Sequence, residues 1–397
     1  KNVEKAGTGE TYITSKESKN IPLVLGERDV LKVATTLPGI TTAGEGASGF
    51  NVRGGNTDQN LILLDNGVIY NPSHFFGLFS ALNPFTTNDV NIYKGYIPAE
   101  YGGRLSSVFD IRSKKSNTEK FSGEASIGPV TNNVAIELPV IKEKAGLMVG
   151  GRSTYSDYLL NVIDNPSLNN STASFFDLIA KYDHNINENN DISATGYYSR
   201  DAFSINSDSL YHYSNQLFSV GWDHKFNEKN KGSLMIGNSQ YKFNIGYDGD
   251  SDNDFDLGYV IEETDLNINM KYLLNADHKF TYGLSSKLYN TRPGYIRPDG
   301  SESVVENLDI PDERGLESAV FISDNFKVNE KLLIEMGLRY SFYFALGPTE
   351  QRIYEDGVPK SEGTLEDTKS YGKNEVSQTY GGPEVRVSAR YFLMSDL

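Results

Sequence analysis

The stretch LLIEMGLRYSF, residues 332–342, alternates apolar and polar side chains with a period of two. Successive side chains of a β-strand point to opposite faces, so this stretch predicts a strand with one apolar and one polar face. The apolar face carries Leu332, Ile334, Met336, Leu338, Tyr340 and Phe342, and the polar face carries Glu335, Gly337, Arg339 and Ser341. A strand that separates lipid from a watery lumen needs this division. A β-sandwich strand alternates too, but it averages about five or six residues, and this stretch is longer.

The same alternation recurs on both sides of this stretch, at residues 266–272 and 385–391. Tight polar turns alternate with longer loops, such as Tyr247–Asp256 and Gly347–Tyr380. Short turns at one end and long loops at the other are typical of outer-membrane barrels. About twelve strands are expected between Glu119 and Leu397, at the spacing of barrel hairpins. Their meander order favours an up-and-down barrel over a Greek key.

The composition agrees with a β protein that meets a membrane. The chain has 25 Tyr and 20 Phe beside a single Trp, although only 38% of its residues are hydrophobic. Amphipathic aromatic side chains suit the membrane–water interface. An aromatic-rich soluble β protein stays equally open on composition alone. No stretch of about 18 apolar residues predicts a transmembrane helix, and this does not exclude a barrel.

Other classes of function find no support in the sequence. The formal net charge is −16, and no basic run marks a nucleic-acid surface. The absence of Cys excludes disulfides and cysteine metal sites. The five His form no HExxH pair, and neither a GxSxG motif nor a P-loop occurs, so we expect no enzyme, no cofactor and no metal site. The acidic loop Asp248–Asp256 lacks EF-hand spacing, and it is expected to be solvated, as is the late loop EGTLEDTKSYGKNE.

The first ~115 residues follow a different pattern. They are rich in Gly, with short apolar runs, and a helix is expected around Asp29–Thr36. The helix should stop at LPGI, residues 37–40, because Pro cannot continue a helix and Gly accepts positive φ. Asn66-Gly67 lies between apolar runs and is a strong hairpin signal. These features predict a compact α+β domain.

Five motifs of this domain, in their order and spacing, identify a family. They are LPGI at 37–40, NVRGG at 51–55, LLDNGV at 63–68, KGYIPAEYGGR at 94–104 and SVFDI at 107–111. The series resembles the plug domain of TonB-dependent transporters. The segment GEGASGF at 44–50 gives it the appearance of transporters from the Bacteroidetes.

The resemblance implies an all-β transmembrane barrel with a small α+β plug domain. A barrel of about 22 antiparallel strands has a lumen too wide for its own side chains to fill, so it needs a plug. We expect the plug at residues 1–117. Residues 118–397 are expected to form the first part of the barrel, about 12 strands, with the remaining strands lying outside this sequence.

The resemblance also implies which residues hold the plug. In the family, an Arg of the RG motif and a basic residue of the later KG motif pair with Glu residues on the barrel wall. These positions match Arg53 and Lys94. Glu335 and Glu384 face inward by the alternation, but the partners cannot be assigned. The residues expected in plug motifs and plug–barrel contacts are Arg53, Gly54, Gly55, Asp65, Gly67, Lys94, Gly95, Tyr101, Gly102, Gly103 and Arg104.

The segment NPSHFFGLFSAL, residues 71–82, follows the predicted hairpin. In the family, loops at this place face the binding cavity. The substrate-facing candidates are His74, Phe75, Phe76 and Phe79. Stacking of the aromatic rings on a solute and packing inside the plug are about equally compatible with the pattern.

The implied function is active import of a scarce solute, such as siderophore-bound iron or another small nutrient, across the bacterial outer membrane. The implied partners are the TonB–ExbB–ExbD energising complex, the solute, the lipid bilayer, and a surface lipoprotein or other outer-membrane subunits. No TonB box, the short apolar segment that TonB captures by strand addition, is visible. The alternative is therefore a transporter-like barrel recruited as a structural or docking subunit of a larger outer-membrane complex. No signal peptide is visible, as expected of an exported protein after processing.

Overall fold

A computed structural model describes residues 10–14, 29–42, 49–155, 171–204, 208–249 and 252–393. Its main element is a large sheet of 13 strands, in which strands that are consecutive along the chain pair antiparallel. The strands on this path are β10 (Ser122–Ile127), β11 (Thr131–Ile141), β12 (Ala145–Thr154), β13 (Thr172–Asn187), β14 (Asn190–Ser204), β15 (Ser209–Lys225), β16 (Asn230–Tyr247), β17 (Phe255–Leu273), β18 (His278–Pro298), β20 (Glu313–Lys327), β21 (Leu332–Leu346) and β24 (Val376–Tyr391). The short β19 (Leu308–Asp309) pairs with β18 and lies off the path. The expected meander of about twelve strands is confirmed.

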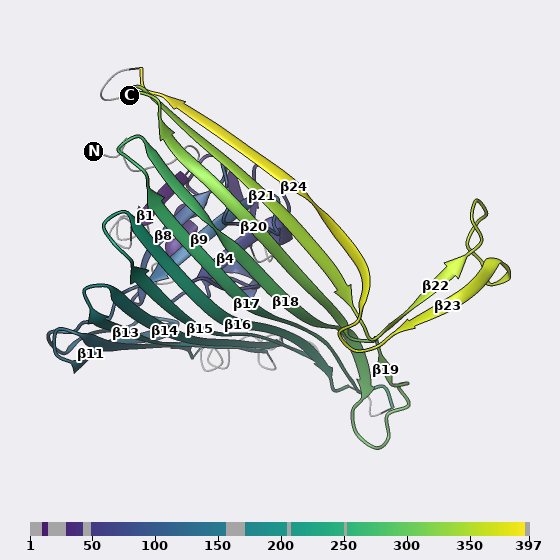
Figure 1. The fold of residues 1–397 in the computed structure, drawn as a ribbon. Helices are drawn as coiled ribbons and strands as arrows, with labels where there is room; N and C mark the ends of the chain where they lie inside the picture. Colours follow the sequence, from purple (N-terminus) through teal and green to yellow (C-terminus); the bar gives the residue numbers. More distant parts are fainter. Residues whose placement is uncertain are drawn as a thin grey trace.

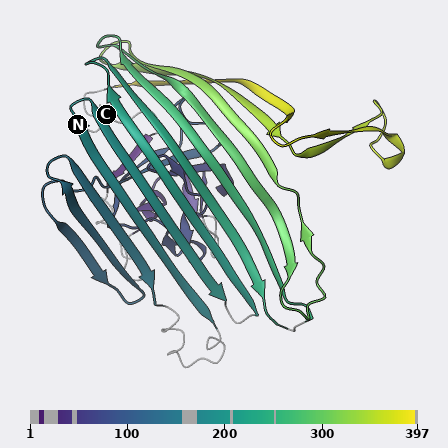
Figure 2. The same cartoon turned by 60° about the horizontal axis from the view of Figure 1, so that its bottom comes forward.

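The large sheet curves around an inner domain that lies on its concave face (Figures 1 and 2). Burial alternates along the strands as a period of two requires. On β13, Asp177 and Ile179 are buried, whereas Leu178 between them is 52% exposed on the convex face. Exposed apolar side chains of this kind are Phe218, Val220, Trp222, Ile236, Val320, Ile322, Met336 and Leu338. An apolar outer face suits contact with lipid, and it confirms the two faces predicted for residues 332–342.

The inner domain is built on a five-stranded sheet in the order β1-β8-β9-β4-β5. The pairing of β4 with β9 is parallel and the other pairings are antiparallel. These strands are β1 (Glu10–Thr14), β4 (Asn60–Leu64), β5 (Gly67–Val68), β8 (Thr87–Tyr93) and β9 (Ser107–Ser113). Two small pairs and two 3-10 helices complete the domain: β2 (Ile40–Thr42) with β3 (Phe50–Val52), β6 (Ser73–His74) with β7 (Phe79–Ser80), η2 (Thr57–Gln59) and η3 (Phe75–Gly77).

The helix α1 (Val30–Ala34) forms where the sequence predicted one. Asp29 caps its N-terminus, because Oδ1 of Asp29 accepts hydrogen bonds from the backbone N–H groups of Leu31 and Lys32 at 2.9 and 3.0 Å. Leu31 is buried against the sheet of the inner domain. With this helix, the predicted α+β character of the N-terminal domain is confirmed.

The inner domain and the large sheet share one hydrophobic core. Buried Ile62, Val90 and Phe109 of the inner domain belong to the same cluster as Ile179 and Leu217 of the large sheet. Burial of apolar surface between the two therefore stabilises the seating of the inner domain.

The segment after β21 differs from the prediction. Residues 347–380 were expected as a loop, but β22 (Thr349–Tyr354) and β23 (Leu365–Tyr371) form a hairpin, with the 3-10 helix η4 (Glu362–Thr364) between them. The hairpin projects away from the large sheet (Figures 1 and 2). The segment is mostly exposed, as expected, but the prediction of a loop was wrong, because a two-stranded hairpin needs only its own cross-strand pairs and its exposed polar residues resemble those of a loop.

The inner domain and the large sheet meet between Ser113, the end of β9, and Ser122, the start of β10. Residue 117, after which the sequence predicts the domain boundary, lies between these two strands. Of the helices in the described residues, none is long and apolar enough to cross a membrane.

Candidate functional site

The concave face of the large sheet, here called the wall, grips the inner domain through polar contacts. Ser239 of β16 illustrates them, because its hydroxyl accepts a hydrogen bond from the backbone N–H of Val68 at 3.1 Å. The contacting wall residues on β13 to β18 are odd-numbered, as expected from the alternation. Four groups of contacts follow the wall from β12 to β24.

The first group surrounds Asp65, in the turn between β4 and β5. Oδ2 of Asp65 accepts a hydrogen bond from Thr195 on β14 at 2.9 Å and lies 3.3 Å from Nζ of Lys181 on β13. Oδ1 accepts from the backbone N–H of Ser113 at 3.0 Å. Burial by itself raises the pKa of Asp65, but Lys181 and the bonds from Ser113 and Thr195 outweigh it and lower that pKa. The carboxylate is therefore held in its charged form between the inner domain and the wall.

The second group surrounds His74, which is fully buried. Its Nδ1 lies 2.6 Å from Oδ2 of Asp201 on β14, and its Nε2 lies 3.4 Å from Oδ2 of Asp177 on β13. Arg152 on β12 donates to the same Asp177 oxygen at 2.7 Å. The imidazole also stacks on Phe175, with ring centroids 4.0 Å apart. The wall therefore surrounds the buried imidazole of His74 with carboxylates.

The third group is centred on Glu263 of β17, which is 1% exposed. Its Oε2 accepts a hydrogen bond from the hydroxyl of Tyr70 at 2.6 Å. Lys287 on β18 lies 3.4 Å from both Glu263 and Asp265. The wall thus supplies both the carboxylates and their ammonium here, and the inner domain adds a hydroxyl.

The fourth group consists of contacts to the backbone of the segment IPAEYGGR, residues 97–104. Nη1 of Arg386 on β24 donates to the carbonyl oxygens of Ile97, Pro98 and Tyr101 at 3.0, 2.7 and 2.8 Å. Nη1 of Arg339 on β21 donates to the carbonyls of Ala99 and Glu100 at 3.2 and 3.3 Å. A planar guanidinium with five N–H donors suits such a cluster of acceptors.

The glycines of this segment are required by close approach. A Cβ on Gly102 would lie 2.5 Å from Nε of Arg339. Gly103 has φ of +76°, and a Cβ there would lie 3.1 Å from Oε1 of Glu317. Gly55 is similar, since its Cβ would meet Oγ of Ser106 at 2.5 Å. Tyr101 packs on Tyr93 and donates its hydroxyl to Asp110 at 3.3 Å.

The two basic residues matched to the family motifs bond within the inner domain. Nζ of Lys94 donates to the carbonyl of Pro38 at 2.9 Å, and the backbone N–H of Arg53 donates to Gly39 at 2.8 Å. Burial and the charge of Arg53 lower the pKa of Lys94. Within the described ranges, neither Arg53 nor Lys94 forms an ion pair with the wall. Their pairing with wall carboxylates stays a prediction.

The remaining residues of the motifs have defined places. Arg53, Gly95 and Arg104 line an open cavity of about 720 Å³ beside β24. Gly54 has φ of +81° and open space around it. Gly67 packs directly against the side chain of Leu217 on β15. Glu384 faces inward as expected, but its ion pairs are with Arg386 and Arg339 of the large sheet itself.

The substrate-facing candidates lie against the wall. Phe75 and Phe79 are 8% and 3% exposed and form an aromatic cluster with Phe175 of β13. His74 belongs to the second group of contacts. The side chain of Phe76 lies outside the described part of the structure. In this arrangement the loop packs on the wall, and contact of its aromatic rings with a solute stays a prediction.

Sequence reasoning missed an aromatic surface higher on the wall, here called the aromatic ledge. It consists of Phe203, Tyr211, Tyr213, Tyr241, Phe243 and Tyr259 on β14 to β17. Tyr213 registers with Phe243, and Phe243 registers with Tyr259, so these rings share one face. The ring of Tyr241 lies 6.4 Å from that of Tyr70, which places this face on the side of the inner domain.

The ledge escaped prediction because the apolar side chains change from the outer to the inner face along the strand. Ile236 on β16 points outward and is exposed, but further along the strand Tyr241 and Phe243 point inward, and Lys242 points outward. β16 has 18 residues, and a membrane-spanning strand needs only about 9–11. The upper part of the strand therefore stands clear of lipid, and its apolar side chains turn to the lumen.

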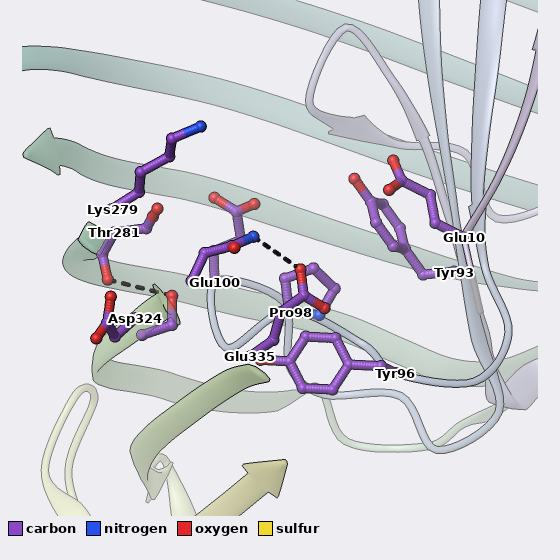
Figure 3. Close-up of a pocket in the computed structure, with 11 residues that line it drawn as sticks. Glu10, Tyr93, Tyr96, Pro98, Glu100, Lys279, Thr281, Asp324 and Glu335 are labelled. Atoms are coloured by element: carbon purple, nitrogen blue, oxygen red, sulfur yellow. Dashed lines mark hydrogen bonds between the residues drawn. The ribbon is translucent and has the colours of Figure 1, made fainter. Parts of the chain in front are cut away.

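One seam between the inner domain and the wall is open. A cavity of about 190 Å³ separates Glu10, Tyr93 and Glu100 from Lys279 and Glu335 of the wall (Figure 3). Among the described residues, no group of His, Asp and Glu is arranged to hold a metal ion. The inner domain and the wall are therefore not closely packed at this seam.

Comparison with known proteins agrees with this geometry. A family model described as the TonB-dependent Receptor Plug Domain matches residues 10–107. No curated protein sequence shows significant similarity to the chain. Among solved structures, the copper transporter OprC superposes with a TM-score of 0.68 at 12% identity, covering 98% of this chain and 61% of that chain.

Two further solved structures are similar. The unliganded ferric citrate transporter FecA gives a TM-score of 0.65 at 12% identity, covering 97% of this chain and 60% of its own. BauA, the ferric preacinetobactin receptor of Acinetobacter baumannii, gives 0.65 at 11% identity, covering 97% and 62%. The chain spans about three fifths of the length of each of these proteins. Residues 10–107 therefore match the plug domain of TonB-dependent receptors, and the chain shares the fold of these plugged transporters.

Proposed function

We propose that the protein imports a small solute across the outer membrane in a TonB-dependent step. The observation that carries this proposal is a plug domain seated on the lumenal face of a barrel sheet and sharing its core. A plug so placed obstructs the lumen, so passage of a solute requires the plug to move. The proposal includes no catalytic step.

The proposed solute is a metal ion or its chelate, with an iron chelate as the first candidate. The names of the similar structures refer to copper, ferric citrate and ferric preacinetobactin. The aromatic ledge is the proposed first contact, because its rings face the lumen above Tyr70 of the plug. The loop with His74, Phe75, Phe76 and Phe79 packs on the wall, and we propose that it contacts the solute only after the loop has moved away from the wall.

The ledge can be tested by uptake of radioactive iron supplied as a panel of ferric chelates. The double variant Phe243→Ala with Tyr259→Ala should lose most uptake while the barrel assembles normally. The matched control is Val260→Ala, which removes an apolar side chain from the outer face of the same strand. Equal uptake by both variants and the wild type would refute the ledge as the contact surface.

The energising step is tested with the full-length receptor purified from outer membranes. A soluble C-terminal domain of TonB is used as bait, and ExbB and ExbD are expected to join only through TonB. Capture by TonB supports import. Failure of capture, together with stable co-purification of other outer-membrane proteins, would overturn it.

A second candidate is a docking subunit of a larger outer-membrane complex. The hairpin of β22 and β23 favours it, since this hairpin projects from the sheet and offers a surface for a lipoprotein or another subunit (Figure 1). Deletion of the hairpin would remove a stoichiometric partner if this function holds, and it would leave TonB capture unchanged.

A further inference from the structure

Among the described contacts between plug and wall, the contact at His74 alone combines three features. The side chain belongs to the plug and is fully buried. Its Nδ1 contacts Oδ2 of Asp201 at 2.6 Å, and its Nε2, which forms no hydrogen bond to the described residues, lies 3.4 Å from Oδ2 of Asp177. Of the five His in the sequence, it is the one in the plug. Histidine is also the side chain whose ordinary pKa lies closest to neutral pH.

Of the two wall carboxylates at the ring of His74, Arg152 pairs with Asp177, so only a protonated imidazole would supply a positive charge to Asp201. Asp201 on β14 and Asp177 on β13 carry two negative charges, and Arg152 on β12 supplies one positive charge to Asp177. Asp29, the cap of α1, also faces this region, since its Oδ2 accepts from Ser80 and Arg152 donates to the carbonyl of Ser80. Tyr197 on β14 donates its hydroxyl to the carbonyl of Ala81. A neutral imidazole would leave the buried Asp201 without a cationic partner.

The backbone beside His74 is strained, and the same carboxylate holds it. Phe75 has φ of +45°, a left-handed conformation that residues with a side chain rarely adopt. Its backbone N–H points to Oδ1 of Asp201 at 3.3 Å, while Oδ2 of Asp201 engages the imidazole. Asp201 therefore fixes both the ring of His74 and the turn that follows it.

We propose that His74 is a proton-dependent latch that holds the plug loop of residues 71–82 to strands β13 and β14. In the latched state the imidazolium bridges Asp201 and Asp177. Loss of its proton weakens the latch, frees Asp201 and lets the strained turn at Phe75 relax away from the wall. The latch concerns how the plug is held, so its test needs neither TonB nor a solute.

The direction of the pH effect follows from the surroundings of the ring. Burial lowers the pKa of His74, but Asp201 and Asp177 outweigh burial and raise that pKa above its ordinary value. A group whose pKa is raised by folding stabilises the folded state fully below its unfolded pKa. This stability is lost as the pH rises through the folded pKa. The latch is therefore closed in mild acid, and it loosens toward alkaline pH.

The experiment follows plug unfolding in urea with the full-length receptor in lipid, from mildly acidic to alkaline pH. A fluorescent label at Leu78→Cys reports the loop, because Leu78 is 50% exposed. The unfolding constant of the wild-type plug should rise roughly tenfold per pH unit, between the ordinary pKa of His and the raised one. The variant His74→Gln should unfold more easily in acid and show no such rise.

Two further variants separate a latch from a packing role. Asp201→Asn removes the carboxylate that favours the imidazolium and lowers the folded pKa of His74, so the rise should end at a lower pH and be smaller. The control is His224→Gln, near the C-terminal end of β15 and away from His74, and it should keep the wild-type dependence on pH. The proposal is overturned if the wild type shows no rise, if His74→Gln keeps it, or if Asp201→Asn leaves its position unchanged. If His74→Gln fails to assemble, the shift in Asp201→Asn decides alone.

Discussion

The wall holds the plug in two different ways at its two ends. On β13 and β14, charged wall residues contact the side chains of His74 and Asp65. On β21 and β24, Arg339 and Arg386 donate hydrogen bonds to carbonyl oxygens of residues 97–101. These bonds involve the plug backbone and not its side chains. The first grip depends on protonation, and the second depends on geometry. The difference shows that one end of the plug is held through the charge of its side chains and the other end through the shape of its backbone.

The largest effect is expected at Asp65. Its change to Ala leaves the buried ammonium of Lys181 without its carboxylate, and removal of one partner of a buried pair costs about 3–5 kcal/mol. The free energy of plug unfolding in urea, measured on the full-length protein, gives this cost. Asp58→Ala, an exposed carboxylate of the same domain, serves as control and should change stability by less than about 0.5 kcal/mol. Equal effects of the two changes would contradict the charged grip.

A smaller loss is expected at Arg386. Its change to Gln removes donors from three carbonyls, and hydrogen bonds to charged groups each contribute about 1.5–3 kcal/mol. The free energy of plug unfolding should fall by about the contribution of one such bond, about 1.5–3 kcal/mol, because water can replace the other donors at this partly exposed site. The loss should be the same at every pH in the urea experiment. Arg352→Gln on the exposed hairpin is the control, and a pH-dependent loss at Arg386 would break the comparison.

The geometric grip also predicts an effect at Gly102. A methyl group there collides with Arg339, and overpacking of this kind costs about 1–3 kcal/mol. The same change combined with Arg339→Ser should cost less, because the colliding guanidinium is gone. Gly382→Ala, where a Cβ meets nothing within 4 Å, is the control. If Gly102→Ala costs the same stability with and without Arg339, the collision with Arg339 is not the cause of the loss.

The smallest effect is expected for acid. The pKa of Asp65 is lowered by folding, so its contribution is present above the ordinary pKa of Asp and is lost as the pH falls through the folded pKa. The loss is about 1.4 kcal/mol per pH unit for one proton. Unfolding in urea at acidic pH should show this slope in the wild type and lose it in Asp65→Asn. A slope that persists in the variant would assign the acid effect to other carboxylates.

Periodicity and motif spacing predicted much of the fold. The alternation in residues 332–342 predicted a strand with an outer apolar face, and Met336 and Leu338 lie exposed there. The LLDNGV motif predicted a turn, and Asp65 and Asn66 have positive φ in it. These features depend on neighbours in the sequence, so local pattern is sufficient to find them. The hairpin of β22 and β23 escaped because its exposed strands carry no apolar face.

The partners of the plug residues could not be predicted in this way. His74 lies 127 positions from Asp201 along the chain, and Arg386 lies 288 positions from Pro98. The family resemblance directed attention to Arg53 and Lys94. In the described residues, the wall contacts Asp65, which the motifs also included, and His74, and two wall arginines bind the plug backbone, while the pairing of Arg53 and Lys94 with wall carboxylates stays a prediction. Glu335 and Glu384 were placed correctly on the inner face because alternation settles the face, but alternation does not settle the partner.

The sequence by itself determined the strand period, the outer apolar band and the plug motifs with their glycine turns, since each follows from side-chain spacing and backbone freedom within a short stretch. Only the tertiary structure decided which wall residue meets which plug residue, that the aromatic ledge turns inward above the lipid, and that His74 is buried between two carboxylates. The physical reason is that these contacts depend on the register of strands far apart in the chain, where a shift of one residue would turn every side chain to the other face.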